Sequence, residues 1–125
     1  MLRNFLILTA VTAALASPAM AAGKTDLATC KTMQASLVPL QTGINDLVAQ
    51  RDASAVALEE AGQAWEDVEI HRLVSKGHAA AADAGKAAYE AAREQLDRDE
   101  TALQERLQQF NADVAAFNAR CTRKG

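Results

Sequence analysis

The residues that could do chemistry in this chain are two histidines, a number of paired carboxylates and two cysteines. His71 and His78 are the only histidines, and Asp67, Glu69 and Asp83 lie near them in the sequence. A closed zinc site needs four such ligands at one point. A turn is expected between the two histidines, so helical spacing does not align them. They are therefore weak candidates for metal ligands, and the sequence predicts no metal and no cofactor.

Paired carboxylates are common, but their surroundings do not resemble an active site. Acids carry out general acid–base catalysis only in a pocket that shifts their pKa values. Here acids and arginines alternate at helical spacing, as in Glu94 and Arg98, which is typical of an ion-paired, solvated face. The paired acids are Glu59-Glu60, Glu66-Asp67 and the run 97–100. Without a nucleophile constellation beside them, we expect that the protein is not an enzyme.

The first 21 residues have the features of a cleaved secretory signal peptide. Arg3 precedes an apolar run from Phe5 to Ala16, and Ala19 and Ala21 form an A-x-A cleavage site. The run is shorter than the roughly 20 residues that a membrane-spanning helix needs, so we expect no transmembrane anchor. The sequence therefore predicts export to the periplasm or the medium. Because two cysteines in an oxidising compartment usually pair, we predict a Cys30–Cys121 disulfide.

The composition of residues 22–125 predicts an all-α protein. These 104 residues include 23 alanines, and the loss of Arg3 changes the net charge from −3 to −4. Alanine, Glu, Gln, Lys, Arg and Leu favour helices, whereas clustered β-branched strands bounded by turn residues are missing from the sequence. An acidic chain without a basic patch argues against a nucleic-acid partner.

Apolar residues recur alternately three and four positions apart, as in a coiled coil. We call these positions the apolar seam. In the first half they are Cys30, Met33, Leu37, Leu40, Ile44, Leu47, Arg51, Ser54, Leu58, Ala61, Trp65 and Val68. In the second half they are Leu103, Leu107, Phe110, Val114, Phe117 and Cys121, preceded by an alanine-rich stretch. Two long helices that pack along these seams are the expected architecture.

The seams and the cysteines together predict an elongated antiparallel helical hairpin, a two-stranded coiled coil closed by the disulfide. Facing residues of such a hairpin have a nearly constant sum of residue numbers, and the disulfide sets that sum at 151. Registers with sums a few units to either side stay open. Gly77 is a helix stop signal, so we expect a first arm over 26–74, a turn over 75–78 and a second arm over 79–121. Pro39 predicts a kink in the first arm, or a break that leaves 26–38 as a separate helix.

Polar residues interrupt both seams. The sum of 151 pairs Arg51 with Glu100, and polar residues at core heptad positions commonly set the register of a coiled coil. We therefore predict a polar core layer that consists of Arg51 and Glu100.

The region before the turn is the candidate partner surface. Trp65 belongs to the seam, whereas Ile70, Leu73 and Val74 lie off it and have no evident partner within the chain. Exposed apolar clusters commonly mark interaction surfaces. The alternatives are that these residues pack among themselves, or that two hairpins dimerise into a four-helix bundle.

The sequence thus favours a non-enzymatic, exported helical-hairpin interaction protein: an adaptor, an assembly factor or a chaperone-like protein. Its partner is expected to be another protein or a second copy of the chain. The alternative is a small metal- or ligand-binding helical protein, with its site at the turn or at a dimer interface.

Overall fold

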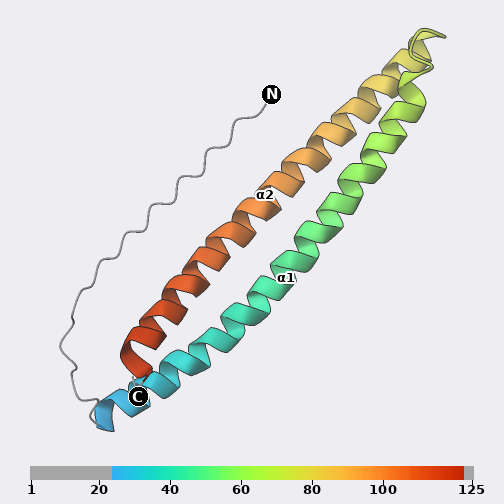
Figure 1. Ribbon diagram of the computed structural model, residues 1–125. Helices are drawn as coiled ribbons and strands as arrows, with labels where there is room; N and C mark the ends of the chain where they lie inside the picture. Colours follow the sequence, from blue (N-terminus) through green and yellow to red (C-terminus); the bar gives the residue numbers. More distant parts are fainter. Residues whose placement is uncertain (1–23, 123–125) are drawn as a thin grey trace, which may run out of the picture.

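Two long antiparallel helices make up the part of the chain that the structure describes. The computed structural model describes residues 24–122, in which α1 (Lys24–Glu69) and α2 (Lys76–Cys121) contain 46 residues each. At 1.5 Å per residue, each helix is about 69 Å long. Figure 1 shows the two helices side by side as a rod, with a single reversal of the chain at one end. The predicted signal peptide, residues 1–21, lies outside the described residues.

The predicted all-α hairpin and its disulfide are confirmed. Cys30 and Cys121 are joined by a disulfide, with their Cα atoms 5.6 Å apart. At the same end of the rod, Arg120 lies 3.6 Å from the carboxylate of Asp26. The rod is thus closed covalently at the end opposite the turn. Within residues 24–122, no helix is long and apolar enough to cross a membrane.

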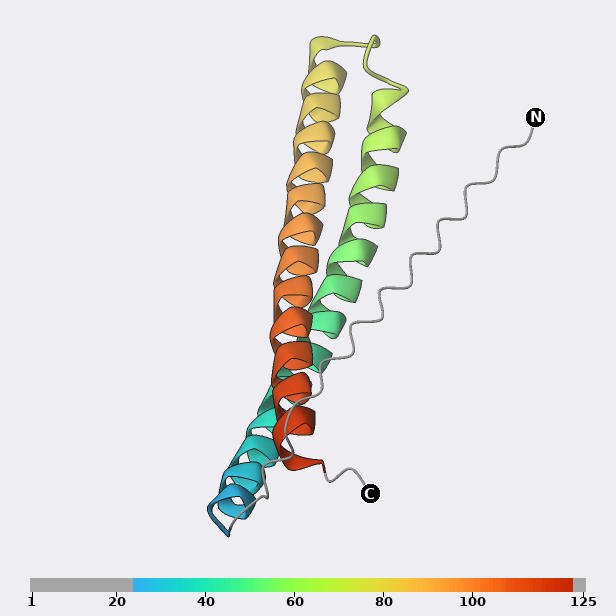
Figure 2. The same cartoon turned by 60° about the vertical axis from the view of Figure 1, so that its left-hand side comes forward.

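The apolar seam of α1 faces α2 along its whole length. All twelve of its positions, from Cys30 to Val68, are buried or half-buried. In α2 most predicted seam positions are also covered, but Leu107 is 39% exposed. The buried residues of the described chain are Ile44, Ala82, Asp99 and Leu103. Figures 1 and 2 show the two helices crossing at a shallow angle, so the core is a narrow strip between them.

The turn lies earlier than predicted, at residues 70–75 instead of 75–78. Ser75 is in an extended conformation and caps the N-terminus of α2, where its side chain accepts a hydrogen bond from the backbone N–H of His78. Serine is among the best N-cap residues because its oxygen satisfies one of the unpaired N–H groups of the first helical turn. Gly77 lies inside α2, and no described glycine has a positive φ. The N-cap signal of Ser75 therefore decided the turn, and the stop signal assigned to Gly77 was wrong.

Pro39 does not break the first helix. α1 continues through Pro39 as one helix, and Figure 1 shows it as an unbroken, gently curved ribbon. A proline inside a helix removes the N–H that would bond to the carbonyl four residues earlier, here that of Ala35. Both residues are exposed, so water can replace the missing donor. The expected separate helix over 26–38 is not formed.

Near the turn, Gly85 of α2 lies close to the backbone of α1. A Cβ atom built on Gly85 would lie 3.2 Å from the Cα atom of Trp65 and 3.1 Å from Cγ2 of Val68. A Cβ on Gly62 would lie 3.5 Å from the ring of Tyr89, which is an ordinary contact. The missing side chain at Gly85 therefore allows the close approach of the two helices at Trp65 and Val68.

Candidate functional site: the turn end of the hairpin

Arg72 fixes the turn to both helices. Its guanidinium donates two hydrogen bonds to the carboxylate of Glu69, over 2.7 and 2.8 Å, and a third to Asp83 over 2.6 Å. Glu69 is the last residue of α1, and Asp83 lies in the second turn of α2. Two-pronged arginine–carboxylate contacts are the more specific kind of ion pair because the planar guanidinium fixes their geometry. The conformation of the turn is therefore held from both sides.

We call the hydrogen-bonded group of Arg72, Glu69 and Asp83 the clamp, and Trp65 also contacts it. Its indole N–H donates a hydrogen bond to Glu69 over 3.1 Å, and its ring lies 5.4 Å from the ring of Tyr89 on α2. Trp65 is half-buried in the seam and joins the two helices at the base of the turn. Of the four residues predicted as a partner surface, Trp65 therefore supports the surface and is not on it.

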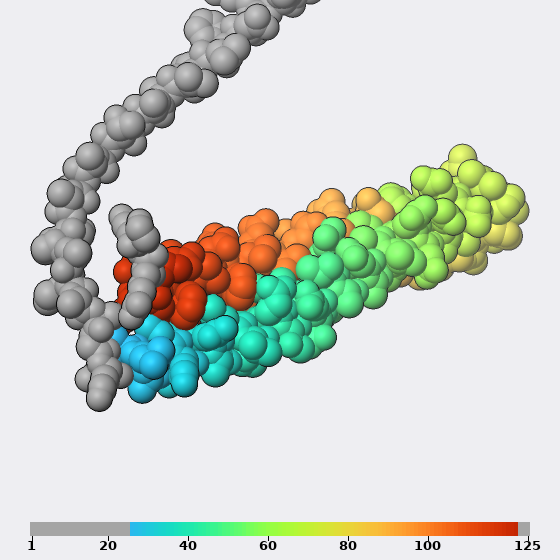
Figure 3. Space-filling model, turned by 60° about the horizontal axis from the view of Figure 1, so that its bottom comes forward, coloured from blue at the N-terminus to red at the C-terminus, as the bar shows by residue number. Residues whose placement is uncertain are grey.

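The other three residues of that prediction are exposed at the end of the rod. Ile70 is 77% exposed, Leu73 98% and Val74 67%. We call these three side chains the aliphatic tip. The alternative in which they pack among themselves would leave them covered, and the structure does not cover them. Figure 3 shows the turn segment as the far end of the space-filling rod, away from the disulfide.

Some ionisable groups around the tip belong to the clamp, and the others are exposed to solvent. Hydrogen bonds from Arg72 are the largest influence on Glu69 and hold its pKa below the ordinary value, while the same bonds raise the pKa of Arg72. Both groups therefore stay charged over the working pH range. Lys76, His71 and His78 are exposed, and no ion pair among the described residues involves Lys76.

The turn brings the two histidines together, which the sequence analysis did not expect. The rings of His71 and His78 lie edge to face with their centroids 6.1 Å apart. The Nδ1 atom of His78 is also 2.8 Å from the hydroxyl of Ser75. No group of three or more His, Cys, Asp or Glu residues within 24–122 is arranged to hold a metal ion. The described residues thus bring two imidazoles together without a third protein ligand beside them.

The polar core layer is present, but it is built from other residues than predicted. Glu100 is exposed, and Arg51 lies 3.3 Å from Asp52 on its own helix. The buried acid is Asp99, which is 3% exposed. Its donors are Gln50 at 2.7 Å, Ser54 at 2.5 Å and Gln95 at 2.9 Å. The predicted Arg51–Glu100 pair is therefore wrong, and Asp99 is the residue that the sequence analysis missed.

The spacing of the α2 seam contained the signal that identifies Asp99. From the turn, the covered positions run through Leu96 and Asp99 to Leu103, and the predicted seam continues with Leu107 and Phe110. Asp99, Leu103 and Leu107 are separated by two successive steps of four residues. Strict alternation of three- and four-residue steps would instead place Glu100 before Leu103. Such an extra four-residue step is a stutter, which shifts the packing face of a coiled coil. The partly exposed Leu107 lies at this irregularity.

The remaining surface of the rod contains exposed ion pairs and shallow hollows. Glu94 and Arg98 form the expected pair along one helix, 3.7 Å apart. One hollow between the helices is lined by Met33, Ser36, Leu37, Asp113 and Ala116. A second is lined by Leu47, Ala102, Glu105, Arg106 and Gln109. Neither hollow contains a histidine or a cysteine.

The site geometry is thus an apolar tip on a rigidly clamped turn. Comparisons of the chain with protein-family models, with curated proteins and with solved structures gave no match.

Proposed function

We propose that this protein is a non-enzymatic, exported interaction protein that binds a partner protein through the aliphatic tip. It would act as an adaptor, an assembly factor or a chaperone-like protein. The observation that carries the proposal is the combination of a nearly fully exposed Leu73 with a turn that Arg72 ties to both helices. Burying an exposed aliphatic side chain is worth roughly 1.5–3 kcal/mol. A surface that is both apolar and pre-ordered loses little entropy on binding.

The rod supports this role by holding the tip far from the other end of the chain. The disulfide closes the opposite end, about 69 Å away along the helices. Export is part of the proposal and is supported by the signal-like residues 1–21 and by the disulfide, which forms in oxidising compartments. The absence of catalysis is likewise proposed. It is supported by the surroundings of the buried acid Asp99, which accepts hydrogen bonds from three neutral side chains between the helices.

Site-specific photo-crosslinking in the native cells tests the proposal. A photoreactive amino acid is placed at Val74 in the tip, and at Val38 on the rod as a matched control. The two valines are 67% and 66% exposed, so they differ in position and hardly in accessibility. We expect a discrete crosslinked product from position 74 that is lost when Ile70 and Leu73 are both changed to serine. Equal products from both positions, or none from position 74, would contradict a partner surface at the tip.

A second candidate function is supported by one observation, the approach of His71 and His78 to 6.1 Å between ring centroids. Two imidazoles supply half of a closed four-ligand zinc site, and a second copy of the chain could supply the other half. Metal analysis of the purified protein, with light scattering in the presence of Zn²⁺, tests it. Stoichiometric zinc in a dimer that His78→Ala abolishes would favour this candidate over the partner-protein proposal.

A further inference from the structure

The first helix has exposed aliphatic residues on its outer side, in addition to the seam that faces α2. Three large aliphatic side chains of α1 are more than half exposed: Leu27 at 63%, Val38 at 66% and Val56 at 55%. Their spacings of 11 and 18 residues correspond to about three and five turns of an α-helix. All three therefore lie along one line on the side of α1. We call the exposed face along this line, from Leu27 to Val56, the outer stripe.

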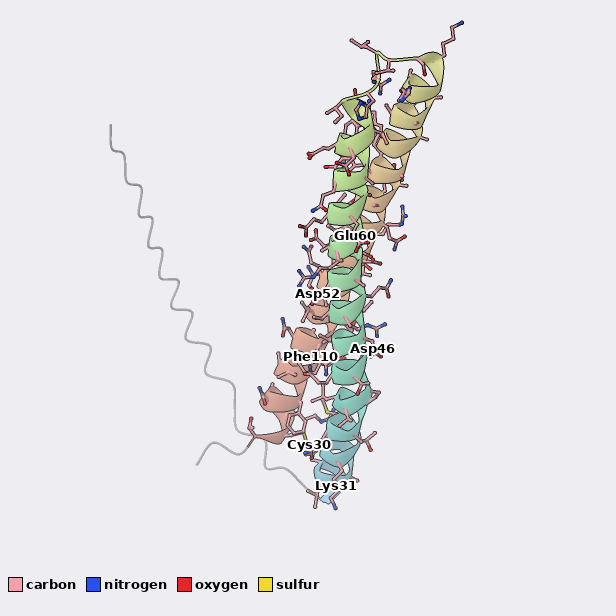
Figure 4. The ribbon with its side chains drawn as sticks, turned by 90° about the vertical axis from the view of Figure 1, so that its right-hand side faces the viewer. Cys30, Lys31, Asp46, Asp52, Glu60 and Phe110 are labelled. Carbon is pink, nitrogen blue, oxygen red and sulfur yellow. A yellow bond between two sulfur atoms is a disulfide. The ribbon has the colours of Figure 1, made fainter. Side chains whose placement is uncertain are left out.

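The outer stripe carries two charged residues, and they have opposite signs. Its other positions are reached by steps of three or four residues, and all of them are exposed. The uncharged ones are Gln34, Gln41, Thr42, Asn45 and Ala49. The charged ones are Lys31 and Asp52, and Figure 4 shows Lys31 near the disulfide end of α1 and Asp52 about halfway along the helix. No ion pair within residues 24–122 involves Lys31, and that of Asp52 is with its sequence neighbour Arg51, over 3.3 Å. Both charges are therefore accessible to a partner.

The outer stripe is complementary to itself when one copy is reversed. Residues that face each other in antiparallel helices have a nearly constant sum of residue numbers, and the sum of 83 that relates Leu27 to Val56 also relates Lys31 to Asp52. The other pairs of this sum are uncharged: Gln34 with Ala49, Val38 with Asn45, and Gln41 with Thr42. A two-fold symmetric interface brings the same patch of both copies together, so every contact occurs twice. Such a dimer would place aliphatic residues together at both ends of the interface and a lysine beside an aspartate at two points.

The size of the outer stripe suits a weak dimer. Its 30 residues, 27–56, are about 44 Å long, and a helix with its side chains is about 10–12 Å wide. Contact along this length would bury on the order of 500 Å² per copy, against about 800 Å² per copy in a standard interface. Interfaces of this smaller size are typical of reversible complexes.

We infer that two copies of this chain associate reversibly through their outer stripes, with α1 of one copy antiparallel to α1 of the other. The sum of 83 places residue 24 of one copy beside residue 59 of the other. The turn over 70–75 then extends beyond the second copy, and both aliphatic tips stay accessible. The inference does not depend on the proposed function, because it concerns a different surface of the rod.

Analytical ultracentrifugation of the purified, disulfide-bonded protein tests the dimer. EDTA is added to remove any zinc that could join two copies through their histidines. We expect a monomer–dimer equilibrium with a micromolar dissociation constant. Lys31→Glu should weaken the dimer about tenfold, because each dimer contains this charge pair twice. Asp52→Lys should have a similar effect, and the two changes together should restore dimerisation because they recreate the pair with its signs exchanged.

Lys76→Glu is the matched control for the charge reversal. Lys76 is also an exposed lysine without an ion pair among the described residues, and its replacement changes the net charge equally, but it lies at the turn end of the rod. The dissociation constant of this variant should stay within about twofold of the original. A monomer at all concentrations, equal effects of Lys31→Glu and Lys76→Glu, or no rescue by the double exchange would overturn the inference.

Cysteine crosslinking tests the register of the dimer. With the sum of 83, the two copies of residue 42 are about 1.5 Å apart along the helices, whereas the two copies of residue 56 are about 44 Å apart. Thr42→Cys should therefore give a disulfide-linked dimer on oxidation, and Val56→Cys should not. Linked dimers from both variants, or from neither, would overturn the antiparallel arrangement.

The inference and the proposed function fail separately. In the native cells, a photoreactive residue at Val38 should give a product with twice the mass of the chain, whereas one at Val74 should give an adduct with the partner protein. A product of another mass at Val38 would mean that another protein covers the outer stripe, which would overturn the inference and leave the aliphatic tip as proposed. Loss of the Val74 adduct with the dimer intact would overturn the proposed function alone.

Discussion

Ser54 on α1 donates its hydroxyl to the buried carboxylate of Asp99 on α2, across the interface between the helices. Gln50 and Gln95 donate to the other oxygen of the same carboxylate, so one acid on α2 is held by two residues of α1 and by one of its own helix. A slip of the helices by one turn would separate this carboxylate from its two donors on α1. The layer therefore favours one register of the hairpin over its neighbours.

Replacing Asp99 tests this layer against the predicted one. Asp99→Ala leaves the half-buried hydroxyl of Ser54 without its acceptor between the helices, which is costly, whereas the exposed Gln50 and Gln95 can turn to water. We expect the melting temperature to fall by more than about 5 °C, measured by circular dichroism. Glu100→Ala, at the neighbouring exposed position, serves as the control and should stay within about 2 °C. The opposite order of effects would restore Glu100 as the core residue.

Acid should weaken the hairpin through Asp99. The hydrogen bond from Ser54 is the largest influence on Asp99, and with those from Gln95 and Gln50 it holds the pKa of this carboxyl below its ordinary value. A lowered pKa in the folded state gives stability that is present above the unfolded-state pKa, near 3.9, and is lost as the pH falls through the folded-state pKa. We expect the urea concentration at the unfolding midpoint to decrease when the pH is lowered below about 4. This decrease should be smaller in Asp99→Asn. A variant with an unchanged pH profile would contradict the assignment.

Two glycines should respond in opposite directions to the same substitution. Gly43→Ala introduces a methyl group with no atom within 4 Å, so it should stabilise α1 by about 0.5–1 kcal/mol through helix propensity. Gly85→Ala places the methyl group 3.2 Å from the backbone of Trp65, so the helices must move apart and the protein should be destabilised. Urea titrations of both variants measure the difference. Stabilisation by both changes would mean that the helices are not in close contact at Gly85.

The disulfide should provide much of the stability of so thin a core. It joins residues 91 positions apart, and the chain-entropy model gives about 4–5 kcal/mol for a loop of this length. We expect dithiothreitol to lower the melting temperature strongly, and Cys30→Ser with Cys121→Ser to reproduce the effect without reductant. Titration of the unreduced, denatured protein should find no free thiol. Two free thiols, or a disulfide-linked dimer, would contradict the intramolecular bridge.

The aliphatic tip should contribute little to folding. Ile70 and Leu73 are 77% and 98% exposed, so changing both to serine removes almost no buried area. We expect the helical circular dichroism signal to be unchanged, and the melting temperature to stay within about 2 °C of that of the original protein. Ile44→Ser, at a buried seam position, is the contrasting change and should destabilise strongly. Unfolding of the tip variant would show that these residues belong to the core.

The sequence by itself determined the architecture. The helix-forming composition, the spacing of the seam from Cys30 to Val68 and the two cysteines together predicted an antiparallel hairpin with one disulfide, and the structure has both features. These signals are local or periodic, so they can be recognised without knowing which residues of the two helices face each other. The sequence left open whether Ile70, Leu73 and Val74 are exposed or pack among themselves, and the structure shows them exposed in the turn.

Only the tertiary structure decided which residues meet across the interface and around the turn. The buried acid is Asp99 and not Glu100, because one extra four-residue step in α2 rotates a different side of the helix toward α1. His71 and His78 approach each other because the turn over 70–75 folds one toward the other, and Arg72 becomes a clamp because the turn brings Glu69 and Asp83 within its reach. A heptad pattern specifies a stripe to within about one residue, whereas hydrogen bonds and ion pairs depend on ångström distances between atoms of different segments.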